Sequence, residues 1–449
     1  MAPVLGSSRL QSLPQVQRSQ AQIASVWSGR KNVPQAGKYR AQQREQEHPV
    51  QQLGEALKTC LIGLAAAASV ALPMAGAPDM LMPAAEAKAL GGNNQVKNAG
   101  ALLRYALPID NKNIRQIQVD LEGVPDDLRI PGSKAFGPIS SSVRKANAQL
   151  EANKSKITGD FAPDRKGDGE SALKKLQTSL RELSDTVESK DKEKIFNQNA
   201  VCLNLIGDIE QAMVKGFPYS VPKEYDSLPQ LKGRATVDVD VKFTSTREGG
   251  LESGVLRMVL DGYNAPITAG NFLDLVNRKF YDGMEVQRAD GFVVQTGNPG
   301  GGTDGFLQDG KVRKIPFEIK VAGDKAPIYG ETLEDLGRFN DDPQLPFNAY
   351  GTLALARQEF EANSGSSQVF WLLKESELTP TGANLLDGRY AVFGYLIDGA
   401  ALLQQAQVGD KIVSMKIVDG LQYLQQPAGA VKTSTASADA PITGSPAKS

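Results

Sequence analysis

The hydrophobic period changes part of the way along the chain, and this change limits the folds that the chain can adopt. Residues 98–216 carry apolar side chains at steps of three and four, whereas residues 237–243 alternate between apolar and charged side chains. A short segment with three prolines, 217–233, separates the two patterns and is typical of a linker. The sequence therefore predicts an α+β chain with two domains: an antiparallel helical bundle over 88–216 and a β-rich domain over 234–424.

The first 87 residues have the composition of targeting segments. Residues 1–44 contain seven Lys and Arg but no Asp or Glu, as in an organelle transit peptide, with a disordered basic tail as the alternative. The apolar run at 60–72 is shorter than the roughly 20 residues that cross a bilayer, and an Ala-Glu-Ala cleavage site follows it. We therefore expect a chloroplast transit peptide over 1–50 and a thylakoid-lumen signal over 51–87. The mature chain would then lie in the lumen, with a peripheral association with the thylakoid membrane left open.

Removal of these segments changes the inventory of reactive side chains. The chain's one histidine, His48, and one of its two cysteines, Cys60, would be lost, leaving Cys202 alone. A histidine-based catalytic triad, a zinc cluster and an intramolecular disulfide are thereby excluded from the mature chain. We therefore expect neither a metal nor a cofactor. The formal net charge of −1 also argues against a nucleic-acid partner.

The helical half predicts an up-and-down bundle, because its helices follow one another with short connections. Helices are expected over 98–105, 112–121, 138–157, 171–188 and 192–215, with a loop over 159–169. The clearest apolar stripe has the a/d spacing of a coiled coil and consists of Leu173, Leu176, Leu180, Leu183 and Val187. The stripe could join two chains or line the inside of one bundle. It covers fewer than three heptads and another amphipathic helix follows it, which favours the bundle.

The β-rich half predicts a closed antiparallel barrel, which buries its own edge strands. Strands are expected over 237–243 and 254–260, and a helix over 265–276. Residues 425–449 are of low complexity, so we expect a disordered tail.

Four motifs occur in this half in a fixed order: T-A-x-N-F at 268–272, FYDGMEVQRADGFVVQTGNP at 280–299, GSSQVF at 365–370 and LDGRYAVFG at 386–394. Each is weak alone, but their order and spacing together are specific. Over 234–422 the chain resembles the cyclophilin family of peptidyl-prolyl isomerases. With its helical half, it is similar to the large thylakoid-lumen cyclophilins of plants.

This resemblance implies partners as well as an activity. It implies action on proline-containing polypeptides, and a folding or assembly role toward lumenal segments of thylakoid membrane proteins, photosystem II foremost. It also implies control of a thylakoid protein phosphatase as a further role.

The chemistry of such a site is compatible with a chain that lacks histidine. Rotation about an X-Pro bond crosses a barrier of about 18–20 kcal/mol, and lowering it needs a twisted amide, a hydrogen-bond donor and an apolar pocket for the ring. By resemblance, Arg288 is the catalytic residue, and its permanently charged guanidinium can stabilise the twisted amide. The residues that resemble the family's substrate-binding positions are Phe292, Gln295, Ala356, Gln368 and Phe370.

The rim of the site departs from the family's common pattern. Gln287 and Tyr390 stand where many members have histidine, and Leu385 stands where many have a tryptophan. We count these three as substrate-binding positions as well. Arg357 replaces a usual asparagine, and the turn between Arg288 and the next phenylalanine is one residue shorter than in the commonest form.

Two functions from different classes therefore remain open. In the first, the protein is a working prolyl isomerase. In the second, the cyclophilin-like domain is a catalytically weak or inactive binding module, and the protein is an assembly chaperone or scaffold. A variant joins the two: an intramolecular contact between bundle and barrel covers the groove and gates it.

Overall fold

The computed structural model describes residues 96–374 and 384–427. The predicted transit peptide (1–50), the lumen signal (51–87) and nearly all of the predicted tail (425–449) lie outside these residues, so those predictions stay predictions. In the part of the chain that the structure describes, no helix is both long and apolar enough to cross a membrane.

The helical half begins its helices at residues that can cap them. The side-chain oxygens of Asn98, Asn111 and Asp191 accept backbone N–H groups at the starts of α3, α4 and α8. The bounds of the helical elements are α3 (Ala99–Tyr105), α4 (Lys112–Glu122), α5 (Val124–Leu128), η2 (Gly132–Ala135), α6 (Phe136–Gly159), η3 (Pro163–Arg165), α7 (Lys166–Glu188) and α8 (Lys192–Ala212).

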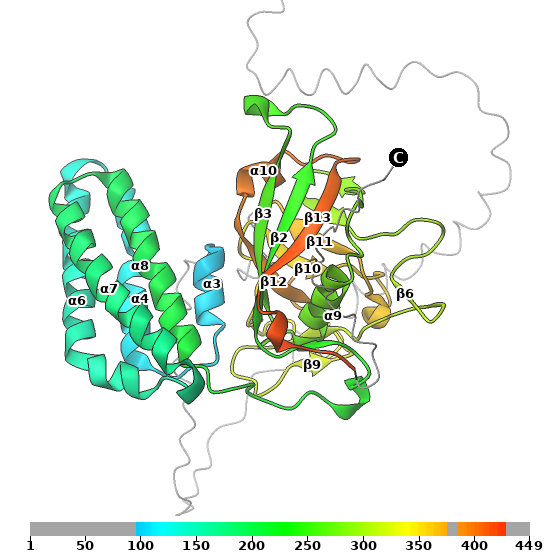
Figure 1. Ribbon diagram of the computed structural model, residues 1–449, viewed down its shortest axis with the longest axis horizontal. Coiled ribbons are helices and arrows are strands. Elements are labelled where there is room, and N and C mark those ends of the chain that lie inside the picture. Colours follow the sequence, from blue (N-terminus) through cyan, green and yellow to red (C-terminus); the bar gives the residue numbers. More distant parts are fainter. Residues whose placement is uncertain (1–95, 375–383, 428–449) are drawn as a thin grey trace, which may run out of the picture. The chain divides into compact units, whose positions relative to one another are not determined.

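The stripe on α7 lies inside the bundle. Leu173, Leu176, Leu180, Leu183 and Val187 are buried in one cluster with apolar residues of α4, α6 and α8. Within one chain, the stripe is therefore already covered, and the bundle prediction is confirmed over the coiled-coil alternative. Figure 1 shows α4, α6, α7 and α8 side by side.

The predicted loop over 159–169 is wrong in its second half. Helix α7 begins at Lys166, directly after the 3-10 turn η3, so Gly169 lies in its first turns. A Cβ atom on Gly169 would approach the Phe161 ring to 2.9 Å. This glycine therefore permits close packing of the helix rather than a loop.

The β-rich half is built on one antiparallel eight-stranded sheet, in the order β13-β2-β3-β12-β10-β11-β5-β4. Its strands are β2 (Arg234–Lys242), β3 (Ser253–Asp261), β4 (Arg288–Ala289), β5 (Val293–Thr296), β10 (Thr352–Leu355), β11 (Val369–Leu372), β12 (Val392–Asp398) and β13 (Lys411–Asp419). The remaining elements are β1 (Gln230–Leu231), α9 (Pro266–Asn277), β6 (Leu307–Gln308), β7 (Lys311–Val312), β8 (Glu318–Ile319), β9 (Ile328–Tyr329), α10 (Ala400–Gln404) and β14 (Leu424–Gln425), with 3-10 turns η4 (Lys223–Tyr225), η5 (Glu248–Gly250), η6 (Ala362–Ser364) and η7 (Leu421–Tyr423).

The antiparallel sheet is confirmed, but the strand ladders do not close it into a barrel. The ladder is open between β4 and β13 among the described residues. An isolated bridge between Glu285 and Lys411 and backbone hydrogen bonds between residues 283–286 and 409–412 cross this opening. The chain just before β4 therefore contacts β13 without forming a strand.

The strands that form the site contribute residues to the hydrophobic core of the β-rich half. Helix α9 is buried along almost its whole length, and its Phe272 ring contacts Tyr281 and Phe393. The same hydrophobic cluster includes Leu102 and Leu103 of α3.

The segment 217–233, predicted as a linker, contains β1, which pairs with β14. The other domain limits stay predictions.

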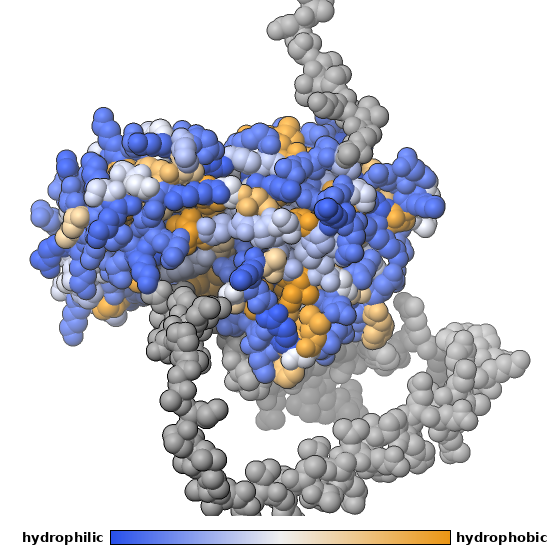
Figure 2. All heavy atoms as spheres, turned by 90° about the horizontal axis from the view of Figure 1, so that it is seen from below, coloured by the Kyte–Doolittle hydropathy of each residue, from blue (hydrophilic) through white to orange (hydrophobic). Residues whose placement is uncertain are grey.

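Apolar side chains gather mainly in the two cores. On the face seen in Figure 2, hydrophilic residues cover most of the described surface and apolar residues form small separate areas. Phe360 is the most exposed of the large apolar residues that the structure describes.

Candidate active site

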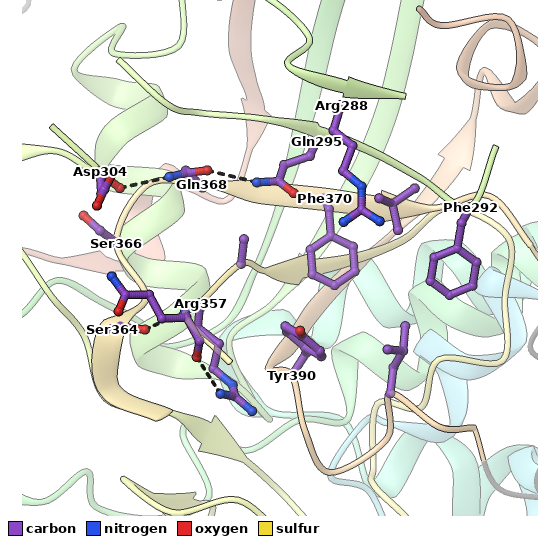
Figure 3. A pocket seen from close by; sticks show the side chains of 14 residues that line it. Arg288, Phe292, Gln295, Asp304, Arg357, Ser364, Ser366, Gln368, Phe370 and Tyr390 are labelled. Atoms are coloured by element: carbon purple, nitrogen blue, oxygen red, sulfur yellow. Dashed lines mark hydrogen bonds between the residues drawn. The ribbon is translucent and has the colours of Figure 1, made fainter. Parts of the chain in front are cut away.

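A cavity of about 450 Å³ opens beside the half of the sheet that ends in β4. The β4–β5 hairpin, the segments around β10 and β11, and the chain before β12 supply its walls, which are shown in Figure 3. The residues that line it are Arg288, Phe292, Val293, Gln295, Asp304, Ala356, Arg357, Gln358, Ser364, Ser366, Gln368, Phe370, Leu386 and Tyr390.

One wall is the β4–β5 hairpin, which places Arg288 directly opposite Gln295. Gly291 has a φ of 79° in the turn, a conformation that favours glycine. The Arg288 guanidinium donates a hydrogen bond from Nε to Asp290 Oδ2 at 2.7 Å, and its Nη2 forms an ion pair with the same oxygen at 2.6 Å. The positive charge at the cavity is therefore held by a carboxylate of the same turn.

The apolar end of the cavity is formed by aromatic rings and a small residue. Phe370 on β11 is buried, meets Tyr390 edge to face at 5.5 Å between ring centroids, and stacks on Phe347 at 6.1 Å. Phe292 and Ala356 line the same space. A small apolar ring, such as that of proline, would meet mainly carbon atoms here.

The other end of the cavity is polar. The Gln295 side-chain amide donates to the Gln368 Oε1 at 2.9 Å, and the Gln368 amide donates to the Asp304 carbonyl at 3.1 Å. This chain of amides runs across β5 and β11 and is visible in Figure 3. Peptide groups of an extended segment would find both donors and acceptors along it.

Arg357 closes the rim between the two ends. Its guanidinium carbon lies 5.1 Å from the centroid of the Tyr390 ring, within the range of a cation–π contact. Its Nε donates to the Arg389 carbonyl at 2.8 Å, and its Nη1 donates to the carbonyls of Gln358 and Glu359. Three backbone carbonyls from two segments are thereby held by one side chain.

The structure brings seven of the nine site residues expected from the sequence to this cavity. They are Arg288, Phe292, Gln295, Ala356, Gln368, Phe370 and Tyr390. Gln287 and Leu385 are not among the lining residues. The Gln287 amide instead exchanges hydrogen bonds with the backbone of Asn298, and Leu385 is 55% exposed.

Some lining residues were not among the expected ones. Ser366 and Leu386 lie inside the GSSQVF and LDGRYAVFG motifs, which could have marked them. Asp304 comes from a glycine-rich loop, and Gln358 and Ser364 come from the segment after β10. Neither segment carries a pattern that predicts where its side chains point.

The Asp290 carboxylate beside Arg288 is held in its charged form. Two backbone N–H groups and the Arg288 guanidinium stabilise the Asp290 carboxylate against the cost of its partial burial, and they lower its pKa to about 2. In the ranges 96–374 and 384–427, no group of three or more Asp, Glu, His or Cys residues could hold a metal ion.

The cavity lies on an antiparallel sheet and combines an arginine, an aromatic pocket and a chain of side-chain amides. These features together define a protein of the cyclophilin class. The family model described as cyclophilin-type peptidyl-prolyl cis-trans isomerase matches residues 243–419. The model described as the PsbQ-like domain of CYP38-like peptidyl-prolyl cis-trans isomerases matches residues 98–214. Both halves of the chain therefore resemble known families.

Several relatives extend this similarity to most of the chain. The chain is 49% identical over 382 residues to the chloroplastic peptidyl-prolyl cis-trans isomerase CYP38 of Arabidopsis thaliana. The aligned region covers 83% of this chain and 86% of the relative. The chain is 46% identical over 339 residues to a putative thylakoid lumen peptidyl-prolyl cis-trans isomerase of Synechocystis. This alignment covers 75% of this chain and 86% of the relative. It is 31% identical over 371 residues to the chloroplastic CYP37 of Arabidopsis thaliana, with 79% and 77% covered.

The chain belongs to the cyclophilin-type peptidyl-prolyl cis-trans isomerase family, in the group that carries a CYP38-like helical domain. The predicted family is thus confirmed. The locations given in the names of the relatives agree with the predicted targeting segments, and they place the chain in the chloroplast thylakoid lumen.

Proposed function

We propose that this protein isomerises X-Pro bonds in polypeptides of the thylakoid lumen. One observation carries the proposal: the Arg288 guanidinium and the Phe370 ring line the same cavity, with Ala356 leaving space between the walls. This is the combination of a fixed charge and an apolar pocket that rotation about a prolyl bond needs.

The two ends of the cavity would bind different parts of the substrate. The proline ring would lie against Phe292, Phe370 and Tyr390, while flanking peptide groups would bind the amides of Gln295 and Gln368. The guanidinium of Arg288 would then donate to the prolyl segment as its amide twists and loses resonance. Because this donor is in place before the twist, its contribution is preorganised electrostatic stabilisation.

The finer assignment is to lumenal segments of thylakoid membrane proteins, with photosystem II subunits foremost. It is supported by the location of the chain in the lumen and by the resemblance to the large lumenal cyclophilins. Pull-down of the full chain on immobilised lumenal peptides, with and without their prolines, tests it. Binding that ignores the proline would contradict this assignment.

A second function is favoured by the rim of the site. Leu385 is exposed rather than folded over the groove, and Gln287 is bonded to Asn298. A groove with this open rim could hold a chain without catalysis, as in an assembly scaffold or a regulator of a thylakoid protein phosphatase. In the gated variant, which joins the two functions, the helical half would cover the groove, and hydrogen exchange in α7 or α8 would rise when peptide binds.

The experiment that separates the two functions is an isomerisation assay. Prolyl isomerisation of a short X-Pro peptide would be followed with the mature chain, its Arg288→Ala variant and an Arg257→Ala control. Arg257 forms an exposed pair with Asp238 away from the cavity. We expect acceleration by the mature chain and by the control, and a loss of roughly 10²-fold or more in the Arg288 variant. No acceleration by any of the three would leave only the binding function, and equal acceleration by all three would contradict the role of Arg288.

A further inference from the structure

We propose that Asp290 is a positioning residue that fixes the orientation of Arg288 in the cavity. This inference rests on the proposed isomerase function and assigns to Asp290 the control of its catalytic group.

The contacts of Asp290 divide between its two carboxylate oxygens. Oδ2 accepts a hydrogen bond from Arg288 Nε and forms an ion pair with its Nη2, whereas Oδ1 accepts hydrogen bonds from the backbone N–H groups of Phe292 at 2.9 Å and Val293 at 3.0 Å. One side chain thereby ties the guanidinium to the backbone of the hairpin. The orientation of Arg288 is therefore set by the turn rather than by its own flexible side chain.

The short turn makes this arrangement possible. Asp290 stands two residues after Arg288 and directly before Gly291, whose positive φ reverses the chain. An aspartate in such a turn commonly accepts hydrogen bonds from the backbone N–H groups that follow it. The other oxygen is then left facing the arginine.

The other side chain beside the guanidinium is Gln295, which lies opposite Arg288 in the hairpin. Its amide NH2 group donates to Gln368, whereas the hydrogen bond of the Arg288 guanidinium goes to Asp290. An arginine has five N–H donors in a fixed fork, and Asp290 contacts the guanidinium only at Nε and Nη2. The donors of Nη1 remain for a peptide in the cavity.

The pair is too exposed to be explained by stability. The side chains of Arg288 and Asp290 are 53% and 42% exposed, and exposed ion pairs contribute little to folding. A peptide that covers the cavity would exclude water from the pair and strengthen it. The depressed pKa of Asp290 is consistent with a carboxylate that stays charged while it does this.

Asp290 would affect catalysis by fixing the orientation of the Arg288 guanidinium. Without Asp290, the guanidinium would have to be ordered by the substrate itself. Small misplacements of a catalytic group can cost up to about 10²-fold in rate. We expect Asp290→Ala to lower kcat/KM by roughly tenfold, with most of the change in kcat.

Two variants of Asp290 separate its contact with arginine from its role in the turn. In Asp290→Asn, the amide oxygen can still accept from Phe292 and Val293, but the NH2 group that replaces Oδ2 cannot accept from Arg288. We therefore expect Asp290→Asn to lose nearly as much activity as Asp290→Ala. Wild-type activity in the asparagine variant, together with a defect in the alanine variant, would assign the effect to the turn and overturn the proposal.

The test uses the mature chain with four variants and two measurements. The variants are Asp290→Ala, Asp290→Asn, Arg288→Ala and the double Arg288→Ala/Asp290→Ala, and Asp238→Asn is the matched control. Asp238 also binds an arginine, Arg257, through two hydrogen bonds, but neither residue lines the cavity. The measurements are kcat/KM with an X-Pro peptide and the NMR signal of the Arg288 Nε–H.

We expect the double variant to be no slower than Arg288→Ala alone, because Asp290 acts through Arg288. We also expect a shifted, slowly exchanging Nε–H signal in the wild type and in Asp238→Asn, lost in both Asp290 variants. An unchanged Nε–H signal in Asp290→Ala would overturn the proposal, whatever the activity. An inactive wild type would instead contradict the isomerase function, and the NMR signal would still decide the positioning.

Discussion

At the scale of single residues, Arg357 shows how a departure from the family pattern acquires a structural role. It stands at a position where an asparagine is usual, and its guanidinium fixes the carbonyls of residues 358, 359 and 389 while it lies over Tyr390. Tyr390 in turn contacts Phe370. The arginine therefore supports the aromatic wall from outside the proline pocket.

We expect Arg357→Ala to weaken the binding of an X-Pro peptide by roughly three- to tenfold, because lost hydrogen bonds of about 0.5–1.5 kcal/mol each loosen the rim. Arg357→Lys should recover little of this loss, since an ammonium cannot hold several carbonyls in one plane. Calorimetric titration of both variants measures the effect, with Arg257→Ala as the exposed control. Full recovery of affinity in the lysine variant would show that only the charge matters.

The residues of the site differ in how far the sequence could predict them. Arg288, Phe292 and Phe370 lie on strands or next to a tight turn, so a motif fixes where they point. Asp304 lies on a loop, and its backbone carbonyl, not its side chain, bonds Gln368. Asp290 is visible in the same motif as Arg288, but only the structure shows that its carboxylate faces the guanidinium.

At the scale of elements, helix α9 illustrates a cap that comes from another strand. Its own N-cap residue, Ala265, provides no side-chain acceptor. Glu318 on β8 accepts instead from the backbone N–H groups of Ile267 at 3.1 Å and Thr268 at 2.8 Å, and from the Thr268 hydroxyl. Periodicity predicts such a helix, but it contains no information on a cap that lies about 50 residues away in the sequence.

Removing this cap should destabilise the β-rich half. In Glu318→Ala the two N–H groups at the start of α9 would be buried without partners, and each such group costs about 1–3 kcal/mol. Glu318→Gln should cost less, because its amide oxygen still accepts from one of the two N–H groups, although its NH2 group faces the other, and because burial already disfavours the charged carboxylate. Urea unfolding followed by Trp371 fluorescence in a chain from Lys88 compares them, with the exposed Glu361→Ala as control. Equal losses in both Glu318 variants would contradict the capping role.

The sequence predicts an element well where its pattern reflects local packing, and poorly where a contact from elsewhere in the sequence decides the structure. The stripe on α7 was predicted correctly because its period is set by packing within the bundle. The start of α7 was missed because Gly169 reads as a loop residue until Phe161 is seen against it. The order of the strands predicts a closed barrel, but the gap between β4 and β13 is crossed only by a segment that contacts β13 without a strand's regular pairing.

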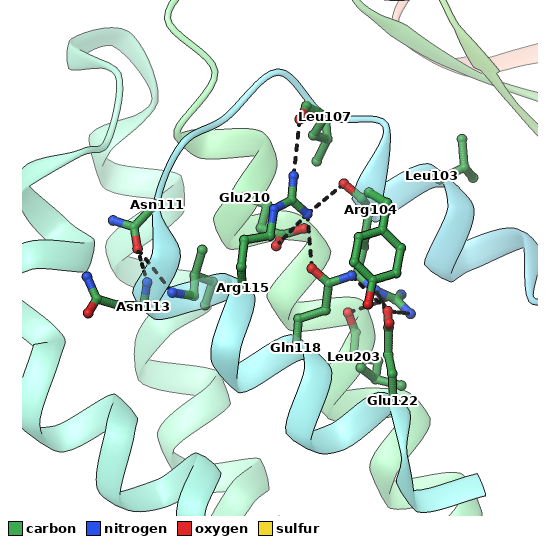
Figure 4. A network of polar contacts seen from close by, with 12 residues as sticks. Leu103, Arg104, Leu107, Asn111, Asn113, Arg115, Gln118, Glu122, Leu203 and Glu210 are labelled. Atoms are coloured by element: carbon green, nitrogen blue, oxygen red, sulfur yellow. Dashed lines mark hydrogen bonds and ion pairs between the residues drawn. The ribbon is translucent and has the colours of Figure 1, made fainter. Parts of the chain in front are cut away.

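At the scale of the whole molecule, buried carboxyl groups link stability to pH in both halves of the chain. Burial raises the pKa of Glu210 in the bundle, and of Glu318 and Asp387 in the β-rich half, each to about 7. Glu210 lies in the polar network of Figure 4, where Arg115 donates to it at 3.0 Å without offsetting its burial. The mature chain has no histidine to titrate in the same range.

The sign of the pH effect follows from these shifts. The unfolded chain releases these protons near the ordinary values of 4.5 for glutamate and 3.8 for aspartate, whereas the folded chain keeps them until about pH 7. Between these values the folded state binds more protons, so its stability falls as pH rises. Carboxylates with lowered pKa, such as Asp290 and Asp410, act in the opposite direction, but only below their ordinary value of 3.8.

We therefore expect the mature chain to unfold at a higher temperature at pH 5 than at pH 8, and Glu210→Gln to reduce this difference. The amide mimics the protonated acid at every pH, so the variant should gain stability relative to the wild type mainly at pH 8. The expected gain is of the order of a few kcal/mol at most, since one pKa unit corresponds to about 1.4 kcal/mol. Thermal unfolding followed by circular dichroism at 222 nm reports on the helices, with the exposed Glu193→Gln on α8 as the matched control. A melting temperature that rises from pH 5 to pH 8, or a Glu210→Gln variant with the full wild-type slope, would show that this carboxyl is already ionised in the folded bundle.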